Sequence, residues 1–280
     1  MGAILVAVVV GFLAARLVWV MIRPVFAAPL FARENFRGLD VPTGAGAVIA
    51  LAAIVVEAGR TLVAAVVDGH HAVAGASVAV LLLAVGFGLL GIIDDVAGSG
   101  DRRGFRGHVA SLAHGRMTTG GLKLVGGAAV SILAVDTARG GSPLGELLVD
   151  AVLVALAANL GNLFDRAPGR TIKVGALAFV VLVAATVASP ALVPVAIVIG
   201  AALGLLLDDL HEHLMLGDAG ANVVGGMIGL GVVVTGTFTV RLAVLAVVLI
   251  LNGASEWVSF SAVIDRVPPL RLLDRAGRRR

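Results

Sequence analysis

Cysteine and tyrosine are absent from the 280 residues, aromatic residues make up 4% and charged residues only 14%. The lack of cysteine excludes disulfide bonds and thiolate metal sites. The scarcity of charge, with 59% hydrophobic residues and a mean hydropathy of +1.05, lies outside the range of soluble domains. The net charge of +3 is scattered between apolar runs, which argues against a nucleic-acid partner. The composition predicts an integral membrane protein.

Long apolar runs fill most of the sequence. A helix needs about 20 apolar residues to cross a bilayer, and only a helix satisfies its own backbone there. Nine such runs predict an all-α, polytopic transmembrane helical bundle of one domain, residues 1–280. They lie at 3–22, 44–66, 72–93, 119–136, 146–163, 171–188, 190–207, 220–236 and 239–261. The sixth and seventh runs are separated only by the proline-marked turn "VASPALVP".

The positions of the positive charges predict the orientation of these helices. If the helices alternate across the membrane, only Arg60, Arg139 and Arg241 of the 21 lysines and arginines fall on one side. Positive residues concentrate on the cytoplasmic side. We therefore expect a multi-pass protein of the plasma membrane, with its N-terminus outside and its C-terminus and active face in the cytoplasm. The basic tail, 262–280, is expected to fix this topology and to bind anionic lipid headgroups.

Unusual polar residues gather in four segments on the predicted inner face. These are "NFRGLDVPTGAG", "GIIDDVAGSG" with the downstream Lys123, "NLGNLFDRAPGRTIK" and "LMLGDAGAN". If Asp94 and Asp95 are helical they point about 100° apart, so one could hold a metal while the other faces a lysine or a phosphate. Asp218 lies at the predicted start of a helix, whose free N–H groups and dipole suit an anion. We expect the four segments to converge.

This combination of residue types predicts a phosphate and metal site. Hard carboxylate oxygens bind Mg²⁺ together with phosphate oxygens, and Mn²⁺ can take the same ligands. Phosphoryl transfer is the reaction class that uses such parts, because positioning and charge neutralisation supply most of its catalysis. Taken singly, each acidic residue is more often a solvated helix end. The prediction depends on their meeting on one face.

The motifs resemble those of the polyprenyl-phosphate N-acetylhexosamine-1-phosphate transferases, the family that includes phospho-N-acetylmuramoyl-pentapeptide transferase. "GIIDD" followed by "KLVGG" is similar to that family's paired aspartates and lysine, and "MLGDAGAN" to its "FMGDSGS". "NFRGLDVPTGAG" resembles its first cytoplasmic loop with "PTxGG", and "NLGNLFD" resembles "NxxNxxDGxDG". The matches follow one another in the family's order from about residue 33 to 230.

The resemblance implies that polyprenyl phosphate, with an undecaprenyl or decaprenyl chain, attacks the β-phosphate of a UDP-sugar and releases UMP with Mg²⁺ present. It implies catalytic roles for Asp94, Asp95 and Asp218, with Asp95 and Asp218 as metal ligands. Lys123 would neutralise phosphate. The other substrate-binding candidates are Asn159, Asn162, Asp165, Arg166, Arg170, Thr43, Arg37 and Arg271.

The chain departs from this family in its nucleotide-facing half. Where the family has "DGLDG" this sequence has "DRAPG", so Arg166 replaces a glycine and Pro168 replaces an aspartate. A late histidine-rich loop would fall near "RVPPLRLLDRAGR", where Arg271 is the only comparable residue. Arg166, Arg170, Lys173 and Arg271 offer other means of binding a diphosphate. An altered sugar donor is therefore an open alternative. A separate departure is the number of helices, since the family usually has ten or eleven and nine are predicted here.

Two hypotheses from other classes remain. An inactive homologue would bind polyprenyl phosphate or an envelope-assembly partner without turnover. A transporter would place its charges near the membrane midplane, and only Glu256, four residues after Asn252, fits that pattern.

Glu57 and Arg60 are expected to neutralise each other. The small residues permit a homodimer but do not argue for one.

Overall fold

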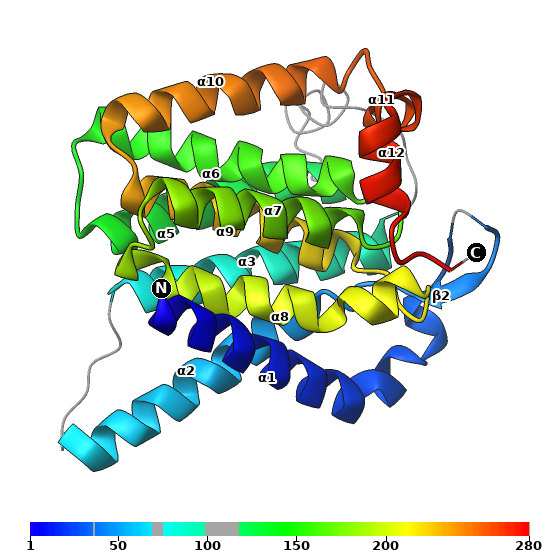
Figure 1. The fold of residues 1–280 in the computed structure, drawn as a ribbon, viewed down its shortest axis with the longest axis horizontal. Coiled ribbons are helices and arrows are strands. Elements are labelled where there is room, and N and C mark those ends of the chain that lie inside the picture. Colours follow the sequence, from blue (N-terminus) through cyan, green and yellow to red (C-terminus); the bar gives the residue numbers. More distant parts are fainter. Residues whose placement is uncertain (36, 69–74, 99–117, 280) are drawn as a thin grey trace.

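The computed structural model describes residues 1–35, 37–68, 75–98 and 118–279, and each of the nine predicted apolar runs contains one long helix there (Figure 1). The last run, predicted at 239–261, is interrupted, because its long helix ends at Ala254 and a short helix begins at Phe260. The long helices are α1 (Gly2–Phe26), α2 (Ala47–Asp68), α3 (Gly75–Ala97), α5 (Thr119–Arg139), α6 (Leu144–Phe164), α7 (Arg170–Ala185), α8 (Val193–Leu210), α9 (Gly217–Thr235) and α10 (Phe238–Ala254). The short elements are η1 (Pro29–Phe31), β1 (Ala32–Glu34), β2 (Asp40–Pro42), η2 (Pro190–Leu192), α11 (Phe260–Arg266) and α12 (Pro268–Arg275). The predicted all-α polytopic bundle is confirmed.

Seven helices of the described part are long and apolar enough to cross a membrane. They are α1, α2, α3, α5, α6, α9 and the continuous stretch Pro190–Leu210, which joins η2 to α8. Two others, α7 with 16 residues and α10 with 17, are shorter. A helix of about 20 residues matches the hydrocarbon thickness of a bilayer. The chain is therefore a multi-pass membrane protein.

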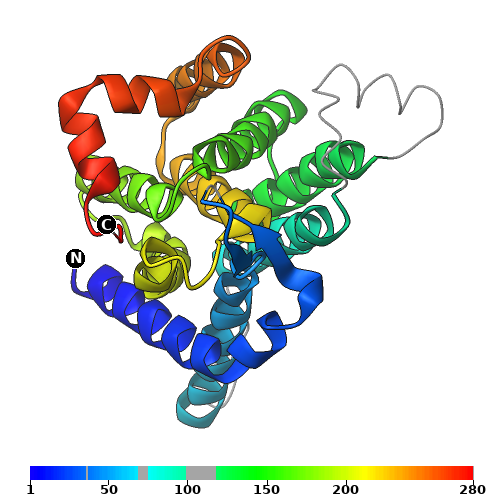
Figure 2. The ribbon, with the colours of Figure 1, turned by 90° about the vertical axis from the view of Figure 1, so that its right-hand side faces the viewer.

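Helix α9 lies in the middle of the bundle. It packs against α2, α3, α6, α7 and α8, and Figure 2 shows it surrounded by them. Its glycines allow this crowding: a methyl group on Gly225 would collide with the backbone of Ala157 in α6, and one on Gly46 would collide with the backbone of Gly220. Small residues let helix backbones approach closely in membrane proteins. The start of α9 is therefore held firmly between its neighbours.

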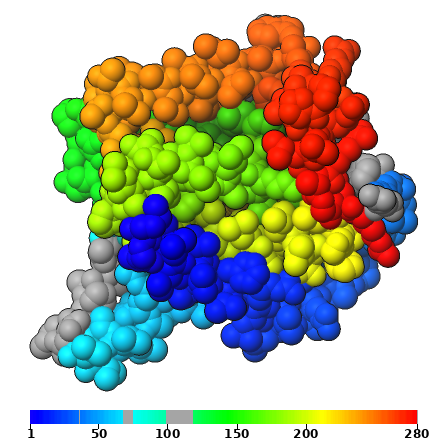
Figure 3. Space-filling view, viewed as in Figure 1, coloured from blue at the N-terminus to red at the C-terminus, as the bar shows by residue number. Residues whose placement is uncertain are grey.

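The predicted polar segments all reach one end of the bundle. Helices α3, α6, α8 and α10 end there, while α5, α7 and α9 begin there (Figure 1). The hairpin of β1 and β2 lies at this end, with Arg33 opposite Val41 in an antiparallel register. The C-terminal helices α11 and α12 also pack over it, as the space-filling view shows (Figure 3). We call this the polar end of the bundle.

Two local predictions are confirmed. The turn between α7 and α8 is tight, because Val187 and Ala188 adopt left-handed φ angles of 50° and 58° before η2 begins at Pro190. The predicted pair in α2 is formed, since Arg60 donates to Glu57 over 2.7 Å. Ser77 of α3 donates to the same carboxylate over 3.1 Å.

A buried ionic cluster ties α5, α6 and α10 together at the opposite end. Arg241 of α10 donates to Glu146 over 2.8 Å and also pairs with Asp150, which is fully buried. Arg139 of α5 donates to Glu146 over 3.0 Å. Buried charges are costly unless they are paired and hydrogen-bonded. This pairing fixes the start of α10, which has few other buried residues.

Candidate functional site

Three helices bring opposite charges together at the polar end. Lys123, in the first turns of α5, extends its Nζ between two carboxylates. It donates to Asp94 Oδ2 at the end of α3 over 3.2 Å and to Asp218 Oδ2 at the start of α9. Asn162 of α6 donates to the same Asp218 oxygen over 3.1 Å. The structure thus brings together residues from three of the four predicted segments.

Asp95 has a different environment from its neighbour Asp94. Its two carboxylate oxygens accept the backbone N–H groups of Asp218 and Ala219, over 3.0 and 3.1 Å. These are free N–H groups of the first turn of α9, where a negative charge is favourable. The anion predicted at this helix start is therefore Asp95 itself. Gly217 makes the approach possible, because it has a φ of 67° and a side chain there would collide with Asp95.

A cavity of about 990 Å³ opens beside this cluster. It lies at the upper end of the usual size of ligand sites, about 300–1,000 Å³. Six predicted site residues line it: Thr43, Asp94, Asp95, Lys123, Asn159 and Arg166. Much of the remaining wall is apolar and includes Phe87, Leu90, Leu124, Leu156 and Leu163. The cavity therefore offers a charged region and an apolar region to the same ligand.

Seven polar residues of the cavity wall did not enter the predicted site, and those with charged or amide side chains are Arg33, Asn222, Asn252 and Glu256. Arg33 of β1 lines the cavity and donates to the carbonyl of Val96, over 2.8 Å. Asn252 and Glu256 line it from the end of α10, and Asn252 accepts a hydrogen bond of 2.7 Å from Asn159. Asn222 of α9 completes the set. The spacing of Asn252 and Glu256 had marked them as unusual, whereas nothing in the sequence distinguishes Arg33 from its basic neighbours.

Five predicted substrate contacts lie outside the residues that line the cavity: Arg37, Asn162, Asp165, Arg170 and Arg271. Arg37 follows β1, pairs with Glu212 over 3.1 Å and donates to the carbonyl of Arg279 over 2.9 Å. Arg271 lies on the exposed side of α12. Basic loop residues at one end of a bundle share a face but need not share a site. Their role in substrate binding stays a prediction.

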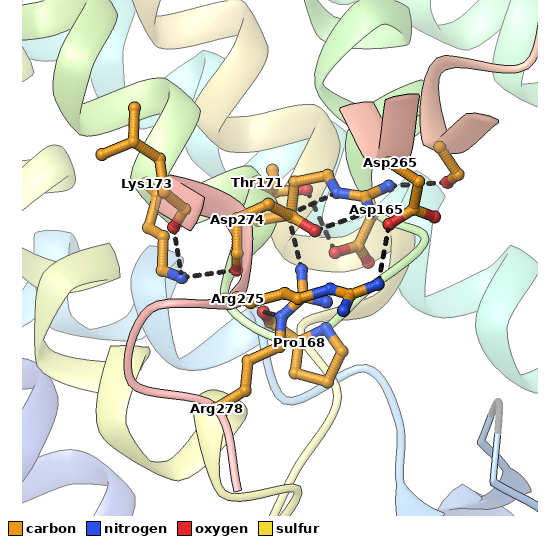
Figure 4. Close-up of polar contacts among 12 residues, drawn as sticks. Asp165, Pro168, Thr171, Lys173, Asp265, Asp274, Arg275 and Arg278 are labelled. Carbon is orange, nitrogen blue, oxygen red and sulfur yellow. Dashed lines mark hydrogen bonds and ion pairs between the residues drawn. The ribbon is translucent and has the colours of Figure 1, made fainter. Parts of the chain in front are cut away.

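Arg170 is buried within the protein. Its Nε and one terminal nitrogen donate to the two oxygens of Asp274 over 2.8 and 3.0 Å, and its other terminal nitrogen donates to Ser261 over 2.7 Å. Lys173 lies beside this pair (Figure 4), where it donates to the carbonyls of Asp274 and Ala276 at the end of α12 over 2.8 and 2.7 Å. These contacts favour a structural role for both cations.

The "DRAPG" loop is held by the same cluster. Arg278 donates to the carbonyl of Pro168 over 3.1 Å and pairs with Asp274, as Figure 4 shows. Gly169 donates its N–H to Asp209 of α8 over 2.9 Å. Arg166 is exposed and lines the cavity. The two ends of the substituted loop therefore have different surroundings. Pro168 contacts the C-terminal segment, and Arg166 faces the cavity.

Asp165 lies behind the cavity wall at the end of α6. It is half-buried and accepts a hydrogen bond of 3.1 Å from Thr171. Burial raises the pKa of Asp165, and the nearby carboxylates of Asp209 and Asp218 raise this pKa further. The raised pKa favours the neutral form of Asp165, which reduces the repulsion among these acidic groups. Its predicted contact with a nucleotide is untested.

The cluster has a suitable donor set for one hard divalent cation. Mg²⁺ is commonly held by one or two carboxylates, with substrate phosphates and water completing its coordination. Asp94 and Asp218 already converge on one cationic group, the ammonium of Lys123. Within the described ranges, no three histidine, aspartate or glutamate side chains form a larger metal-binding group. Asp94 and Asp218 are therefore the pair best placed to hold Mg²⁺, and the metal role predicted for Asp95 competes with its contacts to α9.

No protein-family model and no curated protein matches the chain. The candidate site therefore depends on its own geometry: two carboxylates, a lysine and an amide meet beside a cavity that is partly charged and partly apolar.

Proposed function

We propose that the protein is a Mg²⁺-dependent transferase that moves a sugar-1-phosphate from a UDP-sugar to polyprenyl phosphate. The observation that carries this proposal is the contact of Lys123 with Asp94 and Asp218, beside a cavity that Lys123 and Asp94 line and that has both charged and apolar walls. A lipid phosphate needs such a combination, because its chain requires an apolar surface and its headgroup requires cations.

The side chains divide the proposed reaction between them. Lys123 binds and neutralises a phosphate group, and Arg33 and Arg166 bind the diphosphate of the donor from the cavity wall. Asp95 holds the start of α9, so that Asp94 and Asp218 keep their positions. A phosphate oxygen of the lipid forms a bond to the β-phosphorus of the donor, and the bond from that phosphorus to UMP breaks. When bound, Mg²⁺ neutralises charge on the phosphates.

The distribution of charge supports a cytoplasmic polar end. Arg139 and Arg241 lie in the ionic cluster at the opposite end of the bundle, and Arg60 lies in the second half of α2, away from the polar end. Positive residues are scarce on the outer side of plasma-membrane proteins. We propose that the site faces the cytoplasm, where nucleotide sugars are donors for cell-envelope glycan synthesis.

Release of UMP tests this function. Purified protein would be given undecaprenyl phosphate, Mg²⁺ and a panel of UDP-sugars, beside the Asp218→Ala and Asp136→Ala variants. Asp136 is a matched control because it is an exposed aspartate at the other end of α5. We expect UMP release only when the lipid, the metal and one particular donor are all present. The Asp218→Ala variant should lose this activity and the Asp136→Ala variant should keep it. No UMP from any donor, or equal turnover in both variants, would contradict the proposal.

The geometry also supports a second candidate, an inactive homologue that binds polyprenyl phosphate. Lys123 already neutralises Asp94 and Asp218, and both oxygens of Asp95 are used by α9. A site whose charges are satisfied internally can bind without turning over. Saturable binding of undecaprenyl phosphate, with no UMP released from any donor, would favour this candidate.

A further inference from the structure

The C-terminal segment from Trp257 to Arg279 has an unusual arrangement of side chains. Its helices α11 and α12 follow α10 and lie at the polar end, along one edge of the bundle (Figures 1 and 2). Large apolar side chains point outward: the exposed fraction is 85% for Trp257, 75% for Leu272 and 62% for Leu273. Asp274, between them and the end of α12, is only 7% exposed. The buried residue of α12 is thus an aspartate, while two of its leucines point outward.

The protein holds this inverted orientation in place. Asp274 is fixed by the two hydrogen bonds of Arg170, and the last carbonyls of α12 are fixed by Lys173. These bonds are specific to one rotation of the helix, because turning α12 would remove the carboxylate from its buried partner. The outward leucines are therefore a built feature of the fold, and not the result of a loosely attached tail.

Arginines lie close in sequence to these outward apolar side chains. Arg275 pairs with the exposed Asp265 over 3.1 Å, and Arg278 is turned inward to Asp274. Arg266 and Arg271 are exposed, and within the part of the chain that the structure describes neither forms an ion pair. An apolar patch with free guanidinium groups at its margin is complementary to a surface that is apolar inside and negatively charged outside.

We propose that the outer surface of this C-terminal segment, which carries Trp257, Leu272 and Leu273, docks on the interface of an anionic lipid bilayer. The segment begins where α10 leaves the bundle, so its distance from the bilayer is short. A helix at the edge of the bundle end lies level with the membrane surface around the bundle (Figure 2). Tryptophan favours this boundary, and arginines near it bind anionic headgroups. This docking does not depend on the proposed transferase reaction.

Single-cysteine labelling can locate this face, because the native chain has no cysteine. Leu272→Cys would carry an environment-sensitive fluorophore in full-length protein reconstituted into vesicles of phosphatidylcholine and phosphatidylglycerol. Asp40→Cys, on the exposed strand β2, is the water-facing control, and Leu249→Cys, on the outer side of α10, is the bilayer control. Quenching would be measured with brominated acyl chains and with aqueous iodide.

We expect the label at residue 272 to be quenched by brominated lipids, at a shallower depth than the label at 249, and to be shielded from iodide. The label at 40 should behave in the opposite way. Access of iodide to residue 272 without quenching by lipid would overturn the proposal. Shielding from both quenchers would also overturn it, since a second copy or another protein would then cover the patch.

The headgroup contribution has its own test. Removing phosphatidylglycerol should weaken the lipid quenching of the label at residue 272, and the double change Arg266→Gln with Arg271→Gln should abolish this dependence on the anionic lipid. In the labelled protein that keeps Arg266 and Arg271, equal quenching in neutral and anionic vesicles would contradict the proposed role of these arginines.

Discussion

Breaking the buried pair of Arg170 and Asp274 should release α12 from the bundle. Both side chains are 5% exposed, and two parallel hydrogen bonds of 2.8 and 3.0 Å join them. Replacement of Arg170 by methionine leaves the carboxylate buried with only Arg278 as its cation. Removing one partner of a buried pair costs about 3–5 kcal/mol, and the remaining arginine places this case near 3.

Hydrogen exchange of the α12 amides measures this cost directly. If α12 opens locally, a loss of about 3 kcal/mol accelerates its exchange roughly a hundredfold. Arg275→Met is the matched control on the same helix, because Arg275 and its partner Asp265 are 64% and 53% exposed. An exposed pair of this kind contributes about 0–1 kcal/mol, so the control should exchange almost as slowly as the native protein. Equal acceleration in both variants would refute the reasoning.

A double change separates charge from packing. In Arg170→Met combined with Asp274→Leu no buried carboxylate is left without its partner, and such apolar replacements are often neutral or stabilising. We expect the double variant to recover most of the protection of α12. If it exchanges as fast as Arg170→Met alone, the cost arises from the lost packing of the arginine stem.

The same pair predicts a dependence on pH. Burial raises the pKa of Asp274, but the hydrogen bonds and charge of Arg170 and the charge of Arg278 outweigh this effect, so the pKa lies below its usual value. The stability that the pair contributes is therefore present above the ordinary aspartate pKa of about 4 and is lost as the pH falls through the lowered pKa. Protection of α12, corrected for the intrinsic exchange rate, should fall only in that acidic window.

Three further perturbations have clear expected outcomes. Lys123→Gln should abolish UMP release because the carboxylates lose their shared cation, whereas Lys173→Gln, at the sequence's other lysine, should not. Gly91→Ala should lower the free energy of unfolding by about 1–3 kcal/mol, because its methyl group would meet the backbone at the start of α9. Gly88→Ala has ordinary contact distances and should be neutral; equal thermal midpoints would contradict this difference. The pKa of Asp165 is raised in the folded protein. Its contribution to the stability of the fold is therefore complete below the ordinary aspartate pKa and is lost as the pH rises through the raised value. As the pH rises, the thermal midpoint of the native protein should therefore fall more than the thermal midpoint of Asp165→Asn. Parallel plots of the two midpoints against pH would contradict this prediction.

The helices could be predicted because the bilayer imposes one rule on every apolar run. A run such as 72–93 must be helical whatever its neighbours are, and the structure places α3 at Gly75–Ala97. The alternation of helices then predicts which ends share a side. The central position of α9 could not be predicted in this way. It depends on contacts such as Gly225 against Ala157, and similar small residues occur throughout the sequence.

The site was only partly predictable for the same reason. Sequence spacing brings Asp94 to the correct end of α3, but it does not say that Lys123, 29 residues later, lies beside it. Arg170 is the opposite case, and its predicted substrate contact is untested. A basic residue in a polar loop resembles a phosphate contact, yet its partner Asp274 is 104 residues away and turns it into part of the scaffold. Long-range pairing decides which charges face a cavity and which are buried.

The two adjacent aspartates at the end of α3 now have a physical explanation. Neighbouring residues on a helix point about 100° apart, so a single helix end can serve two partners. Asp95 faces the N–H groups at the start of α9 and joins the two helices, while Asp94 faces Lys123 and the cavity. Because Asp218 belongs to the same first turn of α9, the contact made by Asp95 also sets the distance between Asp218 and Asp94. Asp95 thereby positions Asp218 of α9 relative to Asp94 of α3, the two carboxylates that accept hydrogen bonds from Lys123.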